Sequence, residues 1–275
     1  MNGYGDDGDQ MSNITIDRFK CVRCGQCILA CPARVYTRNS PLESTVLSQG
    51  GAERCIACNH CLAICPVNAI SVNGLDSSDC DLFSSGVYPR LEHIISLVQM
   101  RRSIRTYSDV PVDDSQLEQL LNAVRWAPSA KNRLPVRWLI INGRKKVIEL
   151  ASLVIDWFRQ LKGVDEILDA WDRGLDPIFR GAPCVVAAYT VADSDWAAVD
   201  CSIAVQTFDY CAVAMRLGTC WAGYFVHVAQ NDHEINKWLG LNRDEEIYAA
   251  LMVGNAGGEF YQKVPPRPEI KVKWI

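Results

Sequence analysis

The spacing of eight cysteines constrains this chain more than any other feature of its sequence. A tight run with a cysteine at about every third residue lets three soft thiolates converge on one group of metal atoms, and the fourth thiolate must come from elsewhere. The pattern C-x2-C-x2-C-x3-C-P is written twice, over Cys21, Cys24, Cys27, Cys31 and Pro32 and again over Cys55, Cys58, Cys61, Cys65 and Pro66. The sequence therefore predicts two metal-sulfur sites.

The pattern resembles the signature of bacterial ferredoxins that hold two 4Fe-4S clusters. In such ferredoxins the fourth cysteine of each run serves the other cluster. The resemblance therefore implies one cluster on Cys21, Cys24, Cys27 and Cys65, and a second on Cys31, Cys55, Cys58 and Cys61. Because each site takes thiolates from both runs, we expect the two sites to fold together.

Two other uses of paired cysteines fit less well. Structural zinc usually takes two C-x2-C pairs separated by a loop, whereas each run here is dense and ends in a proline. Disulfides require an oxidising compartment, and the opening MNGYGDDGDQ has neither the basic nor the apolar part of a secretion signal. We therefore expect a cytoplasmic protein whose thiols are free to bind iron.

Composition excludes several classes of partner. The chain has 275 residues, 49% of them hydrophobic, which is ample for a packed core. Its formal net charge of −4 gives no electrostatic footprint for nucleic acid or for an anionic membrane surface. No apolar run reaches the roughly 18 to 20 residues that cross a bilayer. We expect neither nucleic acid nor membrane as a partner.

Changes of composition divide the chain into four parts. The expected parts are a disordered tail over residues 1–12, a two-cluster domain over 13–73, a Ser, Asp and Gly-rich linker over 74–90, and a second domain over 91–275. Within the two-cluster domain, short strands are expected at 14–16 and 69–72, with a hairpin or loop over 37–54.

The second domain alternates helical and strand patterns. Helices are expected from Leu91, after Asp113, over 145–162 and over about 196–217, with strands over 138–142, 184–190 and 248–254. A tight turn is expected over 218–225. The alternation predicts an α+β fold whose central sheet is covered by helices.

Four motifs in the second domain carry cations or small residues at places where ordinary element ends are expected. Each alone has an ordinary explanation, such as a solvated charge run, a helix cap, a turn or a stiff terminus. Together they indicate a ligand site, since arginines are suited to phosphate. The motifs are R-R-S-I-R-T-Y over 101–107, P-S-A-K-N over 128–132, G-T-C-W-A-G-Y-F over 218–225 and P-P-R over 265–267.

In this order the motifs resemble those of the nitroreductase family of flavoproteins, over about residues 91–268. The resemblance implies a mostly antiparallel central sheet wrapped by helices, and bound FMN. The implied FMN residues are Arg101, Ser103, Arg105 and Arg267 at the phosphate and ribityl chain, with Arg102 close by, Pro128, Ser129, Ala130 and Asn132 along the isoalloxazine, and Trp221, Ala222 and Gly223 at the turn whose backbone faces flavin N5. Asp200 falls where the family often has a polar residue on a long interface helix.

The resemblance also implies a homodimer with FMN at the subunit interface. One departure concerns the residues after Asn132, where the family commonly continues with x-Gln-Pro-Trp. This chain has Arg133-Leu134-Pro135-Val136, and the missing glutamine amide changes the donors available to the polar edge of the ring. No residue stands out as a proton donor. The pocket wall is expected to include Trp157, Phe158, Trp171 and Phe179, with ordinary core packing as the equal alternative.

The two halves together predict an oxidoreductase. Iron-sulfur centres pass single electrons, and flavin exchanges them singly or in pairs. We expect reduced ferredoxin or a similar low-potential donor, with a nitroaromatic, quinone, activated alkene or halogenated ring as acceptor. The alternatives are an NAD(P)H-dependent nitroreductase with accessory clusters, and a non-catalytic electron-carrier flavoprotein.

Overall fold

The computed structural model describes residues 11–82, 88–192, 195–258 and 261–275. Most of the tail expected over 1–12, and residues 83–87 of the expected linker, lie outside the described residues. The chain divides into two compact units, and each is treated separately below. The first runs to Tyr88 and includes Lys131–Arg133, and the second comprises Pro89–Ala130 and Leu134–Ile275.

The first unit is built on two half-motifs of similar structure. Strand β1 (Ile14–Ile16) pairs antiparallel with β4 (Ile70–Val72), so that Ile14 lies opposite Val72. Helices α1 (Gln26–Ala30) and α2 (His60–Ile64) begin inside the cysteine runs. Both follow a residue in the left-handed conformation, Gly25 with φ 73° and Asn59 with φ 59°. Glycine and asparagine tolerate this conformation best, which explains why the chain can turn so sharply at both sites.

Between the half-motifs lies a short hairpin. Strand β2 (Tyr36–Thr37) pairs antiparallel with β3 (Val46–Leu47), and Tyr36 lies opposite Leu47. Tyr36 is buried together with Val35, Leu62, Ile70 and Val72 in the small core of this unit. A single 3-10 turn, η1 (Ser77–Asp79), follows β4.

The second unit has a four-stranded sheet in the order β5-β6-β8-β7, with every neighbouring pair antiparallel. The strands are β5 (Arg137–Asn142), β6 (Cys184–Val191), β7 (Gly218–Trp221) and β8 (Glu245–Gly254). The predicted fold class, α+β with a mostly antiparallel sheet wrapped by helices, is therefore confirmed. Three of the strands lie where the apolar runs predicted them, with bounds shifted by one to three residues.

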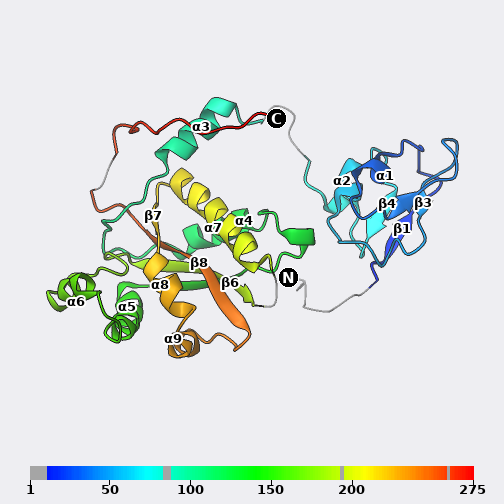
Figure 1. Ribbon diagram of the computed structural model, residues 1–275. Helices are drawn as coiled ribbons and strands as arrows, with labels where there is room; N and C mark the ends of the chain where they lie inside the picture. Colours follow the sequence, from blue (N-terminus) through cyan, green and yellow to red (C-terminus); the bar gives the residue numbers. More distant parts are fainter. Residues whose placement is uncertain (1–10, 83–87, 193–194, 259–260) are drawn as a thin grey trace. The chain divides into compact units, whose positions relative to one another are not determined.

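Helices cover both faces of this sheet (Figure 1). Along β6, Cys184, Val186 and Ala188 enter the core shared with α4 (Asp114–Val124) and α7 (Ala197–Ala214). Val185 and Ala187 enter the opposite core, shared with α5 (Arg144–Phe158), α8 (Gly223–Ala229) and α9 (His233–Trp238). Burial on both faces explains why these strands read as continuous apolar runs. The unit also contains α3 (Leu91–Met100) and α6 (Asp165–Asp172). The short turn η2 (Ala130–Asn132) begins in this unit, and its last two residues are assigned to the first unit.

The prediction of a tight turn over 218–225 is wrong. Gly218–Trp221 is strand β7, and α8 begins at Gly223. Gly218 is needed for close approach, because a Cβ there would lie 2.8 Å from Cγ2 of Ile104. A glycine that admits a neighbouring side chain looks the same in sequence as a glycine that bends the chain.

Among the helices of the described chain, none combines the length and apolar character needed to cross a membrane.

Candidate functional site

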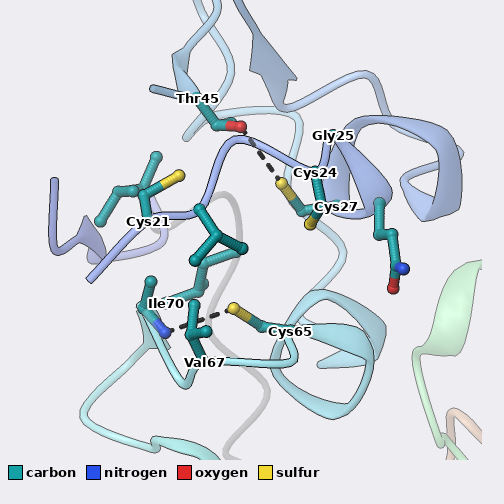
Figure 2. A pocket seen from close by; sticks show the side chains of 12 residues that line it. Cys21, Cys24, Gly25, Cys27, Thr45, Cys65, Val67 and Ile70 are labelled. Atoms are coloured by element: carbon teal, nitrogen blue, oxygen red, sulfur yellow. Dashed lines mark hydrogen bonds between the residues drawn. The ribbon is translucent and has the colours of Figure 1, made fainter. Parts of the chain in front are cut away.

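The first cysteine site is a hollow of about 350 Å³ in the first unit. Its walls include Cys21, Cys24, Cys27 and Cys65, three from the first run and one from the second. Figure 2 shows these side chains around the hollow, together with Thr45 and Ile70. The structure thus brings together the four thiols that the sequence pattern assigned to one cluster. Cys24 is exposed, so this hollow approaches the surface of the unit.

The second hollow, of about 340 Å³, has the reciprocal composition. Its cysteines are Cys31 from the first run and Cys55, Cys58 and Cys61 from the second. His60, the first residue of α2, also lines this hollow and is exposed. All thirteen cysteines of the chain are free thiols.

The size of the hollows bears on which metal group fits. A single tetrahedral zinc with Zn–S bonds of about 2.3 Å would hold its sulfurs about 4 Å apart. Over the described ranges, no three His, Cys, Asp or Glu side chains are grouped tightly enough to hold a metal ion. A four-iron cuboid is wider than one ion, so its thiolates must surround a space. Two thiol-lined hollows suit such a cuboid.

Hydrogen-bond donors point at the sulfurs of both sites. The amide of Ala69 donates to Cys65 Sγ at 3.3 Å, and the amide of Val35 donates to Cys31 Sγ at 3.4 Å. The amide of Ala57 donates to Cys55 Sγ at 3.4 Å. Burial raises the pKa of the Cys27 and Cys61 thiols. Iron would be held by thiolates, so its binding would release the protons of these buried thiols, and the amide donors would stabilise the thiolates of Cys31, Cys55 and Cys65.

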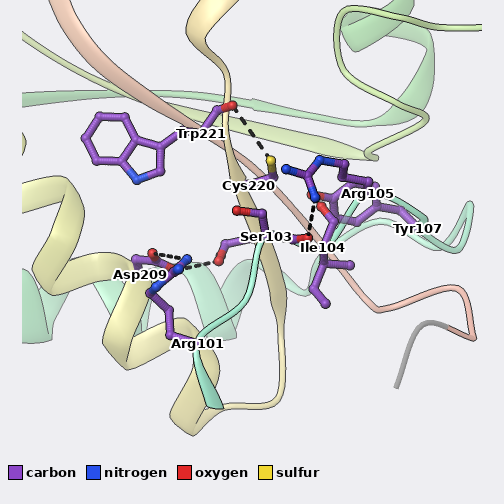
Figure 3. A network of polar contacts seen from close by, with 9 residues as sticks. Arg101, Ser103, Ile104, Arg105, Tyr107, Asp209, Cys220 and Trp221 are labelled. Atoms are coloured by element: carbon purple, nitrogen blue, oxygen red, sulfur yellow. Dashed lines mark hydrogen bonds and ion pairs between the residues drawn. The ribbon is translucent and has the colours of Figure 1, made fainter. Parts of the chain in front are cut away.

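In the second unit, a buried carboxylate organises the R-R-S-I-R-T-Y segment. Asp209 on α7 is 1% exposed, and its Oδ2 lies 3.4 Å from Nη1 of Arg101. The hydroxyl of Thr219 donates to Oδ1 of the same carboxylate. Burial raises the pKa of Asp209, while Thr219 and Arg101 act in the opposite direction. Figure 3 shows this network next to Ser103 and Arg105.

The segment after Arg101 lies along strand β7. Ser103 forms a parallel bridge with Thr219, and the amide of Ile104 donates to the Thr219 carbonyl at 2.8 Å. Arg105 Nη1 donates to the Ser103 carbonyl at 3.3 Å. The Arg102 guanidinium lies over the ring of Tyr261, 5.5 Å from its centroid. The network thus gathers Arg101, Ser103 and Arg105 around one strand.

The P-S-A-K-N motif forms a strained loop tied to α7. Asp200, 3% exposed, accepts a hydrogen bond from the amide of Ala130 at 2.9 Å. Ser129 Oγ accepts from the amide of Leu134 at 2.8 Å. Lys131, Asn132 and Leu134 all have positive φ, between 49° and 55°. Left-handed non-glycine residues cost free energy and cluster at functional sites. Leu134 stands where the family commonly has glutamine. Its backbone forms part of the strained loop, and its side chain is half-exposed.

The third and fourth motifs are placed less compactly. The amide of Ala222 donates to the Ala250 carbonyl at 2.9 Å, so that donor is committed to the sheet. Gly223 is the first residue of α8, where a backbone N–H has no partner inside its own helix, and a Cβ there would meet open space. Trp221 is 39% exposed at the end of β7. Arg267 lies in an exposed extended segment.

Sequence reasoning missed Asp209 and Thr219. The available sign was the presence of two carboxylates, Asp200 and Asp209, inside an otherwise largely apolar helix, because buried acids need partners. The aromatic residues suggested for a pocket wall are mainly core: Phe158 and Phe179 are 4% and 0% exposed, and Trp157 and Trp171 pack against the same core.

The chain thus has an α+β fold, and its N-terminal unit carries two hollows lined by cysteines. Residues 98–255 match the nitroreductase family, and residues 14–72 match the 4Fe-4S dicluster domain. The first match spans more than half of the chain, which therefore belongs to the nitroreductase family. Both resemblances seen in the sequence are confirmed at this level.

Three proteins that resemble the chain share 20–26% of their residues with it. An Archaeoglobus fulgidus protein assigned as an NADH dehydrogenase/NAD(P)H nitroreductase is 22% identical over 62% of this chain and 91% of its own length. The Bacillus subtilis FMN reductase [NAD(P)H] is 26% identical over 60% of this chain and 66% of its own length. A Bacteroides fragilis nitroreductase solved with bound FMN is 20% identical, with a TM-score of 0.56 over 66% of this chain and 98% of that chain.

Proposed function

We propose that the protein is a cytoplasmic FMN- and iron-sulfur-dependent oxidoreductase that reduces a small organic acceptor with electrons from reduced ferredoxin or a similar low-potential donor. The observation that carries the proposal is the pair of complete cysteine quartets, each around its own hollow, on a nitroreductase-family chain. When bound, the clusters supply one-electron steps and FMN supplies the two-electron reduction. Each two-electron reduction takes two donor electrons. A quinone or an activated alkene also takes up two protons, a nitroaromatic takes up two protons and releases water as it becomes a nitroso compound, and a halogenated ring takes up one proton and releases halide.

The residues that the resemblance assigned to FMN suit this cofactor. The contact with Asp209 engages Nη1 of Arg101, and a guanidinium carries five N–H donors in all. Asp209 thus fixes the direction of Arg101, while Ser103 and Arg105 are held nearby by β7. Arg102 and Arg267 would add further positive charge toward the phosphate. Pro128, Ser129, Ala130 and Asn132 would line the ring, with Trp221 beside it and the Gly223 amide toward its N5 edge.

The exposed apolar face of α3 supports a homodimer. Leu91, Ile94, Ile95 and Val98 lie on this helix with 71%, 42%, 46% and 48% of their surfaces exposed, and none of its residues is buried. A contiguous apolar face of this kind marks an interaction surface. We propose that a second copy of the chain covers it and that residues of both copies complete each flavin site.

The second candidate function is an NAD(P)H-dependent nitroreductase. The description of the Bacillus subtilis relative favours it, because that protein is an NAD(P)H-dependent FMN reductase. The third possibility, an electron carrier without turnover of its own, keeps both cofactors but reduces no small acceptor. Nitrofurazone or menadione reduction at steady state separates a catalyst from such a carrier.

The deciding experiment is anaerobic stopped-flow with reduced ferredoxin and, separately, with NADPH, after iron, sulfide and FMN have been quantified. Reduced ferredoxin should reduce the clusters and then bleach the flavin. The variant Cys65→Ala should lose this route, and Cys80→Ala, which removes a thiol outside both quartets, should keep it. Flavin bleaching by NADPH alone, with oxidised clusters, would contradict the ferredoxin route and favour the second candidate.

A further inference from the structure

The hairpin between the cysteine runs places one hydroxyl beside each hollow. Oη of Tyr36 lies 3.1 Å from Sγ of Cys61, in the second hollow. Oγ1 of Thr45 lies 3.6 Å from Sγ of Cys27, in the first hollow, as Figure 2 shows. Cys27 and Cys61 are both the third cysteine of their run, so the two sulfurs occupy equivalent positions in the repeat. The two hydroxyls, one from a tyrosine and one from a threonine, do not.

Both hydroxyls are buried and held in fixed positions. Tyr36 is 4% exposed and Thr45 is 2% exposed. The β2–β3 pairing sets their register, and the amide of Ser48 donates to the Val35 carbonyl at 2.9 Å. Arg54 Nη2 donates to Ser48 Oγ at 2.8 Å, which ties the hairpin to the start of the second run. Hydrogen bonds in such a low-dielectric site are electrostatically stronger than in water.

The direction of each hydrogen bond follows from cluster chemistry. A cysteine that binds iron has lost its proton, so the hydroxyl must be the donor and the sulfur the acceptor. A phenol ordinarily ionises near pH 10, so the Tyr36 phenol keeps the proton that it donates. Threonine hydroxyls are neutral donors throughout the working pH range.

We propose that Tyr36 and Thr45 are positioning residues that set the reduction potentials of the two clusters, Tyr36 through Cys61 and Thr45 through Cys27. The inference rests on the proposed function, since it requires clusters on these cysteines. Reduction adds one electron to a cluster and its thiolates, with no bond formed or broken. A hydroxyl dipole directed at a ligand sulfur stabilises that added negative charge, and hydrogen bonds to sulfur are among the factors that set cluster potentials. Each hydroxyl therefore raises the potential of its own cluster.

The test is a redox titration of the anaerobically purified full-length protein, followed by electron paramagnetic resonance. Tyr36→Phe should lower one midpoint potential, and Thr45→Val should lower the other. We expect the reduction equilibrium to fall about tenfold for Tyr36→Phe, which equals about 59 mV for one electron, and to fall less for Thr45→Val because its contact is longer. Thr45→Ser retains a hydroxyl and should restore the wild-type potential.

A matched control removes an exposed hydroxyl of the same unit that lines neither hollow. Thr15 Oγ1 lies 2.5 Å from Ser71 Oγ on the exposed side of the β1–β4 pair, so Thr15→Val should change neither potential. Unchanged potentials in both test variants, or a shift of the same cluster by both, would overturn the inference. Should Tyr36→Phe fail to hold its clusters, Thr45→Val and Thr45→Ser still decide between the outcomes. A wild-type protein without iron and sulfide would instead refute the proposed function.

Discussion

Removal of the Asp209 carboxylate is the perturbation whose cost can be worked most directly from the structure. In Asp209→Ala the Thr219 hydroxyl, 1% exposed, loses its acceptor, which costs about 1–3 kcal/mol. Arg101 loses a charged partner, but its side chain is 24% exposed and water replaces part of that interaction. We therefore expect the free energy of unfolding to fall by about 3 kcal/mol.

Asp209→Asn should behave differently. The amide oxygen can still accept from Thr219, and the neutral side chain avoids the desolvation that raises the pKa of Asp209. These effects oppose the loss of attraction to Arg101, so we expect the free energy of unfolding to lie within about 1 kcal/mol of wild type.

A raised folded-state pKa also means that the folded protein binds the Asp209 proton more tightly than the unfolded chain does. The stability contribution of Asp209 therefore falls as pH rises from the ordinary pKa of 3.8 to the raised value, and Asp209→Asn removes that dependence.

Tryptophan fluorescence is the suitable assay, because all eight tryptophans of the chain lie between residues 126 and 274, in the second unit. Anaerobic urea unfolding followed in this way reports on that unit. Asp172→Ala is the control, since it breaks an ion pair with Arg159 whose two side chains are 45% and 56% exposed, and should cost less than about 1 kcal/mol. An Asp209→Ala protein as stable as this control would refute the reasoning, as would equal losses in Asp209→Asn and Asp209→Ala.

Three further predictions follow from contacts described above. Asp200→Ala should free the Ala130 amide and weaken FMN binding about tenfold, the equivalent of one hydrogen bond of about 1.4 kcal/mol, measured by flavin fluorescence; unchanged affinity would contradict a role for the loop. Gly218→Ala should lower the unfolding free energy by about 1–3 kcal/mol through its clash with Ile104, and a stability equal to wild type would show that the neighbour yields freely. If α3 forms the proposed dimer interface, Ile95→Asp should yield a monomer in sedimentation velocity without loss of iron, whereas a persisting dimer would place the interface elsewhere.

The elements that sequence could predict are those specified by local pattern. The spacing of the cysteines limits which thiolates can converge, and the apolar run at Cys184–Val191 could be recognised because both faces of β6 are buried. The helix over Leu91–Met100 agreed with its periodicity even though its apolar face is uncovered. These features can be recognised from residues that lie close together in the sequence.

The elements that sequence could not predict depend on distant partners. Asp209 lies 108 residues from Arg101, and no local pattern pairs them. Gly218 was misinterpreted because the reason for that glycine is Ile104, more than a hundred residues earlier. The contacts of Tyr36 and Thr45 with sulfur required the hairpin register, which the polar composition of the segment did not specify.

The short hairpin has a consequence for how the chain can vary in length. Its connection, between Thr37 and Val46, contains no cysteine, so residues can be gained or lost there without altering either quartet. Moving β3 by a single position against β2 would turn the Thr45 side of the ribbon outward, because neighbouring residues of a strand point to opposite sides. Tyr36 precedes the connection and would stay in place. Insertions in this connection would therefore change the reduction potential of the first cluster and leave that of the second unchanged. The two potentials of the duplicated module could thus vary independently.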